Sequence, residues 1–326
     1  MKAVRFRTPG GPETLVVEEL PDPRPHNGEV LIRVAGAGLN RADSLQRLGR
    51  SNLPPGASNI FGMEVSGTIA EAGFGVHGFV QGDHVMALLA SGGYAEYVAV
   101  NADHVVAIPK GIDLIEAAGV PEVAATLVSN ICDTGQFAPG ETVLIHGATG
   151  GIGAFGIQLV KALGGRVAVT ASSDAKLEVA HRLGADVLIN YKEEDFAKRM
   201  LAEGGADIVI DTVGGKYLPK NVEALAPFGR IVTIGMQGGP EGTLDFAALM
   251  KKKASVSGTL LRDRSPQQKT AIMASVKRLV LPLLKAGAIK PVTEKVYPLS
   301  AVSKAHVHFD SRAHIGKILL DCRQTD

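Results

Sequence analysis

Cysteine is scarce in this chain of 326 residues, which contains only Cys132 and Cys322. Two cysteines so far apart exclude a disulfide framework and any cysteine-rich zinc site, and they fit a reducing compartment. Charge of one sign is not in excess either, because the formal net charge is +1. A near-neutral chain without a basic stripe gives no electrostatic argument for binding nucleic acid.

Long apolar runs are also missing. No uninterrupted run is long enough to span a bilayer, and residues 1–9 lack the apolar core of a signal peptide. We therefore expect a cytoplasmic protein with no membrane partner. The length predicts about two domains, and a hydrophobic content of 45% is ample for sizeable cores.

Glycine is abundant, and its most informative cluster lies at residues 147–153. A strand-like run, residues 142–146, precedes the cluster, and apolar residues at helical spacing follow it. Strand, glycine turn and helix form the context in which a dinucleotide binds, because the helix start offers unpaired N–H groups to a pyrophosphate. Ala148 occupies the first glycine place of the usual motif, so this turn alone fits equally well with simple packing of a helix on a strand.

The rhythm of the chain changes at about residue 122. Residues 1–121 alternate short strands with turns, as in a β-barrel, whereas residues 122–262 alternate strands with helices, which predicts a parallel sheet. The last segment, 263–326, has a helix and then two strands that resemble those of residues 1–121. We therefore expect an α/β chain in which a Rossmann domain, 122–262, is inserted into a β domain formed by 1–121 and 263–326.

The end of the second strand of the Rossmann unit predicts the cofactor. NAD-binding proteins usually carry an acidic residue there, which would repel a 2′-phosphate. This chain offers three possible donors to that phosphate, Ser172, Lys176 and Tyr191. We interpret Asp174 as a helix N-cap. An exposed helix lysine is the alternative for Lys176, but the missing acid and the three donors together favour NADPH.

The whole chain resembles the zinc-independent medium-chain dehydrogenase/reductase superfamily, in its quinone oxidoreductase (zeta-crystallin-like) branch. The segments that carry the resemblance are residues 39–43, 62–67, 120–122 with Thr126, 146–153, 183–186, 189–191, 211–215 and 314–318. The resemblance implies a GroES-like β-barrel catalytic domain with an inserted Rossmann domain, bound NADPH and usually a homodimer. Residues 255–261 are predicted to be the last strand of the Rossmann sheet, whose unpaired edge would form the dimer contact.

The resemblance also implies the site residues. The cofactor-binding residues would be Asn40, Thr126, Thr149, Gly150, Gly151, Ile152, Ser172, Lys176, Tyr191, Gly235, Leu260 and Lys317. The substrate pocket would contain Asn40, Leu45, Ser51 and Thr126. A turn residue is the alternative for Asn40, and we interpret Asp43 as a helix cap.

No metal is expected. Zinc relatives use the histidine of a Gly-His-Glu motif together with cysteine or acidic ligands. Met63 stands at the histidine position here, and the one carboxylate that remains, Glu64, cannot hold zinc alone. No catalytic residue emerges from the sequence, since His146 is better interpreted as a hydrogen-bonded core histidine.

The function expected is NADPH-dependent hydride transfer to a quinone without a metal. Related quinone reductases often have tyrosines where Leu45 and Ser51 stand, so the pocket here would be more open and less aromatic. Reduction of enones, 2-alkenals or enoyl thioesters on the same scaffold is the first alternative. A non-catalytic NADPH-binding protein with a structural or RNA-binding role is the second.

Overall fold

The structure, a computed structural model, describes residues 1–324. The chain forms two compact units. Unit 1 comprises residues 1–125, 261–285 and 291–326, and unit 2 comprises residues 126–260 and 286–290. Within the described part of the chain, no helix combines the length and the apolar character needed to cross a membrane.

Unit 2 is built on a parallel sheet of six strands. The strands are β8 (Thr142–His146), β9 (Arg166–Ala171), β10 (Val187–Asn190), β11 (Ala206–Asp211), β12 (Leu225–Thr233) and β13 (Ser255–Gly258). Their order in the sheet is β10-β9-β8-β11-β12-β13. The chain therefore winds outward in one direction from β8, crosses back, and winds outward in the other direction from β11. This is the Rossmann strand order, so the predicted fold class is confirmed.

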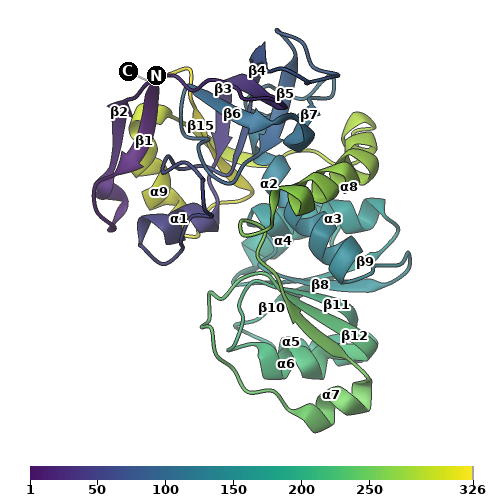
Figure 1. Ribbon diagram of the computed structural model, residues 1–326. Coiled ribbons are helices and arrows are strands. Elements are labelled where there is room, and N and C mark those ends of the chain that lie inside the picture. Colours follow the sequence, from purple (N-terminus) through teal and green to yellow (C-terminus); the bar gives the residue numbers. More distant parts are fainter. Residues whose placement is uncertain (325–326) are drawn as a thin grey trace. The chain divides into compact units, whose positions relative to one another are not determined.

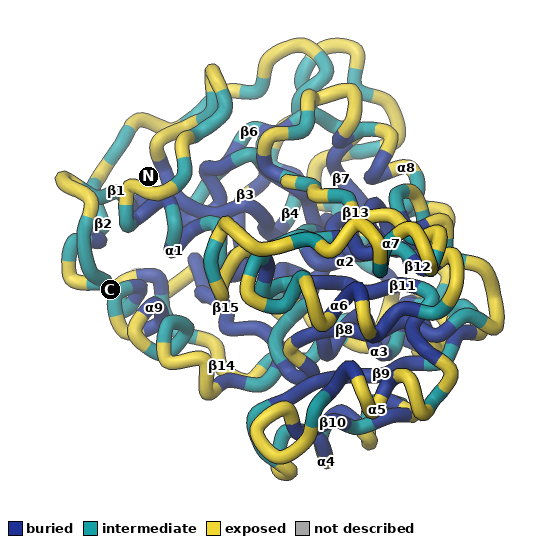
Figure 2. The backbone as a smooth tube through the Cα atoms, turned by 90° about the horizontal axis from the view of Figure 1, so that it is seen from below, coloured by how far each residue is buried: buried dark blue, intermediate teal, exposed yellow. Residues whose placement is uncertain are grey.

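Helices cover both faces of this sheet. They are α3 (Gly151–Ala162), α4 (Asp174–Arg182), α5 (Phe196–Ala202), α6 (Leu218–Ala224) and α7 (Phe246–Lys252). Helices α3 and α4 lie on one face, and α5 and α6 lie on the other (Figure 1). Strand β8 is buried along its whole length, whereas β13 at the edge is mostly exposed (Figure 2). A strand buried on both faces needs a continuous apolar run, which is what residues 142–146 provide.

Unit 1 has a seven-stranded sheet and a separate hairpin of β1 (Lys2–Phe6) and β2 (Leu15–Glu19). The sheet contains β3 (Glu29–Gly38), β4 (Glu64–Ala72), β5 (His84–Leu88), β6 (Tyr97–Asn101), β7 (Val105–Ala107), β14 (Thr293–Pro298) and β15 (Lys317–Asp321). Strand β15 pairs antiparallel with β3, so the C-terminal segment extends a sheet that the N-terminal segment begins. The helices that follow the chain through this unit are α1 (Arg41–Arg47), α2 (Pro121–Leu127), α8 (Pro266–Lys285) and α9 (Val302–Asp310).

The core of unit 1 contains a histidine with unusual surroundings. His306 on α9 is fully buried, and within residues 1–324 neither of its ring nitrogens has a hydrogen-bond partner. The rings of Phe61 and Tyr94 pack against it edge-on. Burial, with a smaller contribution from Arg47, lowers the pKa of His306 from 6.5 to about 3.

This histidine should make unit 1 sensitive to acid. Between pH 6.5 and about 3, His306 is protonated in the unfolded chain but neutral in the folded protein. The free energy of unfolding therefore falls as the pH falls through that window. The loss of unfolding free energy due to His306 approaches about 1.4 kcal/mol per pH unit in this window. We expect His306→Leu to flatten the fall in unfolding free energy between pH 6 and 4, measured by urea denaturation. An unchanged slope would contradict the assignment.

Candidate functional site

The sequence-predicted cofactor residues of unit 2 follow the carboxyl ends of its parallel strands. Thr149, Gly150, Gly151 and Ile152 follow β8, Ser172 and Lys176 follow β9, Tyr191 follows β10, Gly235 follows β12, and Leu260 follows β13. Because all six strands are parallel, these ends share one edge of the sheet. Open α/β sheets bind ligands at that edge, at the point where the strand order reverses. Here the reversal lies between β8 and β11.

The turn between β8 and α3 depends on close backbone approach. Gly147 has φ of +88°, a conformation that favours glycine. A Cβ atom on Gly153 would lie 2.1 Å from the carbonyl oxygen of Gly147, so only glycine fits there. Gly150 caps α3 without a side-chain hydrogen bond, and the first turn of the helix has no acidic residue. The first N–H groups of α3 are therefore free of capping side chains and can receive an anion.

Two of the predicted phosphate contacts are neighbours. The N–H of Tyr191 donates to the carbonyl oxygen of Ala171 at 3.1 Å. Ala171 is the last residue of β9 and Ser172 follows it directly, so Tyr191 lies close to Ser172. Lys176 lies in the first turn of α4, the end of a helix that disfavours a cation. A lysine placed there is compatible with an anionic ligand that offsets the unfavourable dipole.

The interpretation of Asp174 as the N-cap of α4 was wrong. Ser173 occupies the cap position, with an extended backbone, and Asp174 is the first helical residue. The amide of Asn190 donates to the Asp174 carboxylate at 3.1 Å, which ties the end of β10 to the start of α4. Sequence alone could not separate two adjacent residues that are both good N-caps.

Two further residues of unit 2 that the sequence singled out, His146 and Thr126, are both buried. His146 is fully hydrogen-bonded in the core, through Nδ1 to Thr170 Oγ1 at 3.0 Å and Nε2 to Asn221 Oδ1 at 2.8 Å. Burial lowers its pKa, so the ring is neutral, and its prediction as a core histidine is confirmed. Thr126 is 6% exposed, and its carbonyl oxygen accepts from Asn130 Nδ2 at 2.7 Å.

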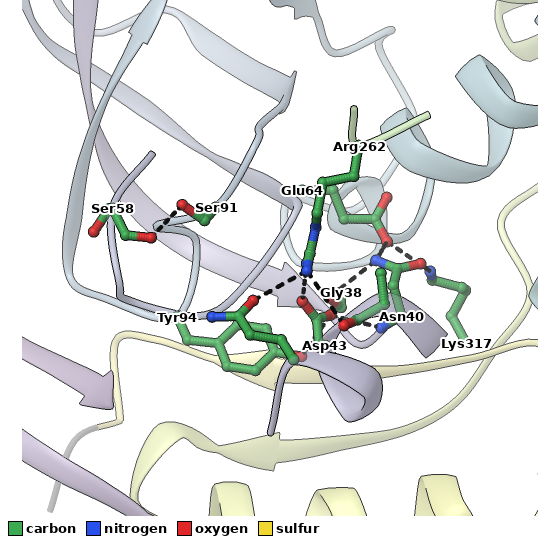
Figure 3. A network of polar contacts seen from close by, with 11 residues as sticks. Gly38, Asn40, Asp43, Ser58, Glu64, Ser91, Tyr94, Arg262 and Lys317 are labelled. Carbon is green, nitrogen blue, oxygen red and sulfur yellow. Dashed lines mark hydrogen bonds and ion pairs between the residues drawn. The ribbon is translucent and has the colours of Figure 1, made fainter. Parts of the chain in front are cut away.

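In unit 1, a buried polar cluster surrounds Asp43 (Figure 3). Asp43 is fully buried and pairs with Arg262 at 3.0 Å. It also accepts from the backbone N–H of Asn40 at 2.9 Å and from the hydroxyl of Tyr94 at 3.1 Å. The N-cap of α1 is Asn40, and Asp43, the third residue of the helix, completes a capping box by accepting from the N–H of Asn40. Burial raises the pKa of Asp43, although the Arg262 charge opposes this rise.

A second buried pair adjoins the first. Glu64 is fully buried, and its Oε1 accepts from Lys317 Nζ at 2.6 Å and from Asn40 Nδ2 at 3.0 Å. Its Oε2 accepts from the backbone N–H of Glu122 at 2.9 Å. Lys317 also donates to Asn40 Oδ1 at 2.7 Å. The structure thus joins Asn40 and Lys317, two residues predicted for the cofactor, through a carboxylate for which the sequence suggested no role.

The remaining pocket predictions lie around α1. Leu45 is half-buried on α1, and Ser51 is half-buried in the segment that follows it. Across residues 1–324, no three His, Cys, Asp or Glu side chains are grouped in a way that could hold a metal ion. A cavity of about 490 Å³ on unit 1 is lined by other residues, among them Asp113, Glu116 and Tyr297.

Sequence reasoning missed Arg262 and the partners of Glu64. One signal was present: Lys317 opens the apolar run of the buried strand β15, and Glu64 opens a run of small and apolar residues that forms the buried first half of β4. A charge in such a run is almost never buried without a partner. Which partner each charge takes depends on the pairing of β15 with β3, residues far apart in the sequence.

Comparison with known proteins agrees with this architecture. Residues 26–110 match the family described as "Alcohol dehydrogenase GroES-like domain", and residues 151–277 match the family described as "Zinc-binding dehydrogenase". Among curated proteins, the chain is 30% identical to the quinone oxidoreductase of Sus scrofa, over 98% of this chain and 97% of that protein. It is 32% identical, over 99% of its own length, to a phenolphthiocerol/phthiocerol polyketide synthase protein of Mycobacterium tuberculosis, of which it spans only 15%.

Solved structures give the same result. An NAD-dependent alcohol dehydrogenase superposes with a TM-score of 0.87 at 32% identity, over 98% of this chain and 99% of that one. Escherichia coli quinone oxidoreductase complexed with NADPH has a TM-score of 0.87 at 27% identity, over 98% and 100%. CurK enoyl reductase has a TM-score of 0.86 at 27% identity, over 98% of each chain. The chain therefore belongs to the medium-chain dehydrogenase/reductase superfamily, in its quinone oxidoreductase branch, and is an oxidoreductase.

Proposed function

We propose that this protein binds NADPH and reduces a small electrophilic acceptor, a quinone, without a metal. The observation that carries the proposal is the set of residues gathered at the carboxyl edge of the unit 2 sheet. A helix start without a capping side chain follows β8, and two hydroxyls and a lysine follow β9 and β10. An enzyme with a bound NADPH complex is among the similar structures, which supports the same cofactor here.

The residues present fit this cofactor. The N–H groups at the start of α3 would hold the pyrophosphate, and nothing lies within 4 Å of the place where a Cβ of Gly150 would project. Ser172, Lys176 and Tyr191 would hold the 2′-phosphate, while Gly235 and Leu260 would border the cofactor farther along the edge. When bound, NADPH supplies the hydride, and the protein supplies binding, orientation and electrostatics.

The nature of the acceptor is a separate choice. Quinones and activated C=C bonds are electrophilic without a metal, so orientation near the cofactor supplies much of the catalysis. The quinone oxidoreductases among the relatives favour a quinone as the acceptor. The similarity to an enoyl reductase makes enones or enoyl thioesters the second candidate. Leu45 and Ser51 would make a less aromatic pocket for the acceptor.

A panel of acceptors tests the proposal. Purified protein should oxidise NADPH when a quinone is added, with a higher kcat/KM for quinones than for enones, 2-alkenals or enoyl thioesters. A higher kcat/KM for enones would move the assignment to the second candidate. Tight NADPH binding with no turnover on any acceptor would favour a non-catalytic role and overturn the reductase proposal.

Lys176 offers a test of the cofactor at one residue. Lys176→Ala removes a charge-assisted contact to the 2′-phosphate, worth about 1–3 kcal/mol, so the Kd for NADPH should rise roughly tenfold to a hundredfold. The Kd for NADH, which lacks that phosphate, should stay unchanged. Calorimetric titration of both cofactors gives the two constants. Equal losses for both, or no loss for either, would refute this role of Lys176.

We also propose a homodimer formed through β13. This strand ends the sheet order, and no described strand pairs with its outer edge. Val256 on β13 is 37% exposed. An unpaired edge invites pairing with a second copy across a two-fold axis.

Light scattering tests the dimer. Wild type should have the mass of a dimer at micromolar concentration, and Val256→Lys should shift it to the monomer, because a charge on the edge opposes pairing. Phe74→Lys is the matched control, since Phe74 is an apolar residue of unit 1 with 85% exposure. A monomeric wild type, or equal dissociation in both variants, would contradict this assembly.

A further inference from the structure

We propose that Glu64 is a positioning residue for ligand binding: it holds the ammonium of Lys317 and the carboxamide of Asn40 so that Lys317 donates its remaining N–H to an oxygen of the bound ligand. The inference rests on the proposed function. The ligand oxygen belongs either to NADPH, as a hydroxyl or carbonyl, or to the electrophilic acceptor, as its carbonyl.

The hydrogen bonds of Lys317 leave one donor over. An ammonium has three N–H groups. Among residues 1–324, Lys317 donates to Glu64 Oε1 and Asn40 Oδ1, and to no third acceptor. Lys317 is 7% exposed, so its third N–H has little access to bulk water. A buried donor left without a partner is unfavourable, and a ligand oxygen would remove that penalty.

The carboxamide of Asn40 has a fixed orientation for the same reason. Its Nδ2 donates to Glu64 Oε1 at 3.0 Å and to the Gly38 carbonyl oxygen at 3.4 Å, so both amide hydrogens are in use. Its Oδ1 accepts from Lys317, and the same side chain accepts from the backbone N–H of Asp43 in the capping box of α1. Asn40 therefore has no amide hydrogen left to donate to a ligand, and its carboxamide is held at both its nitrogen and its oxygen. The third N–H of Lys317 is thus the donor that this arrangement leaves for a ligand oxygen.

Glu64 is itself held in one position. The backbone N–H of Glu122 at the start of α2 donates to its second oxygen. Gly38 on β3 leaves the space that the carboxylate occupies, because a Cβ there would lie 2.1 Å from Glu64 Oε1. A carboxylate with partners on both oxygens and no free space does not rotate, which preorganises the ammonium it holds.

Variants of the pair separate positioning from simple stability. Lys317→Met removes the donor and leaves Glu64 unpaired, Glu64→Gln keeps the volume and removes the charge, and the double variant removes both charges together. The double variant should regain stability that Lys317→Met loses, because no buried charge is left unpaired. Lys277→Met is the matched control, since among residues 1–324 Lys277 of unit 1 donates only to the carbonyl oxygen of Asp103.

The measured quantities are the Kd for NADPH in the binary complex and the KM and kcat for a quinone. We expect Lys317→Met and the double variant to change one of these by roughly tenfold to a hundredfold, and Glu64→Gln to change the same one by less. A raised Kd assigns the ligand oxygen to NADPH. An unchanged Kd with altered KM or kcat assigns it to the acceptor. Lys277→Met should match wild type.

The inference is overturned if the folded double variant has wild-type Kd, KM and kcat, because the pair would then serve stability alone. If the double variant does not fold, Glu64→Gln decides, and unchanged constants in that variant overturn the inference. Failure of the proposed function is a different result: wild type itself would bind no NADPH or turn over no acceptor, and the inference would fall with it.

Discussion

Replacing Asp43 by alanine should lower the unfolding free energy of unit 1 by about 3–5 kcal/mol. The substitution leaves the guanidinium of Arg262, only 5% exposed, without its counter-charge. Gln46 Oε1 and the Ala42 carbonyl oxygen still accept from Arg262 but carry no charge. The hydroxyl of Tyr94 and the N–H of Asn40 lose their acceptor as well. Several buried donors are therefore stranded by one change.

Urea denaturation measures the unfolding free energy that Asp43→Ala loses, and two further variants serve as comparisons. Arg182→Ala breaks an ion pair with Glu178 in which both side chains are 62% exposed, so it should change stability by less than about 1 kcal/mol. Asp43→Leu combined with Arg262→Met removes both buried charges and should recover part of the loss. A loss below about 1 kcal/mol for Asp43→Ala would show that the pair is not buried in solution.

Gly153→Ala should damage unit 2 and its ligand site together. The added Cβ would lie 2.1 Å from the Gly147 carbonyl oxygen and 2.5 Å from the carbonyl carbon of Ala148. Backbone atoms cannot move aside as a side chain can, so α3 must shift away from the turn. We expect a stability loss of about 1–3 kcal/mol and an NADPH Kd raised roughly tenfold to a hundredfold.

Gly150→Ala is the informative counterpart. Gly150 has φ of −68°, which alanine adopts, and the new methyl would meet nothing within 4 Å. Stability should change by less than about 0.5 kcal/mol. NADPH affinity should still fall, because the methyl would enter the space where we place the pyrophosphate. Thermal denaturation and calorimetric titration of both variants test this contrast. Equal stability losses in the two would contradict the packing argument.

The strand pattern made the fold predictable. Buried strands such as β8 and edge residues such as those of β13 carry composition signals that are local in sequence, and the order of strands and helices then restricts the topology. The same locality explains the errors at element ends. Asp174 and Ser173 are interchangeable as caps by sequence, and only the bond from Asn190 shows the different role of Asp174.

The candidate site was predictable only in part, because its partners come from distant segments. The residues at the sheet edge follow strands in a regular order, so motif and spacing locate them. The bonds among Glu64, Lys317 and Asn40 depend on strands β3, β4 and β15 meeting in one sheet. Charges were visible in the sequence, but their pairing is a property of tertiary structure.

The most direct test of the account is single-turnover oxidation of NADPH by a quinone, in the presence of a strong metal chelator. We predict loss of one NADPH per quinone reduced, at a rate that the chelator does not change. The rate should fall when deuterium replaces the transferred hydrogen of NADPH. No NADPH loss above the rate without protein, or activity that the chelator abolishes, would contradict metal-free hydride transfer by this protein.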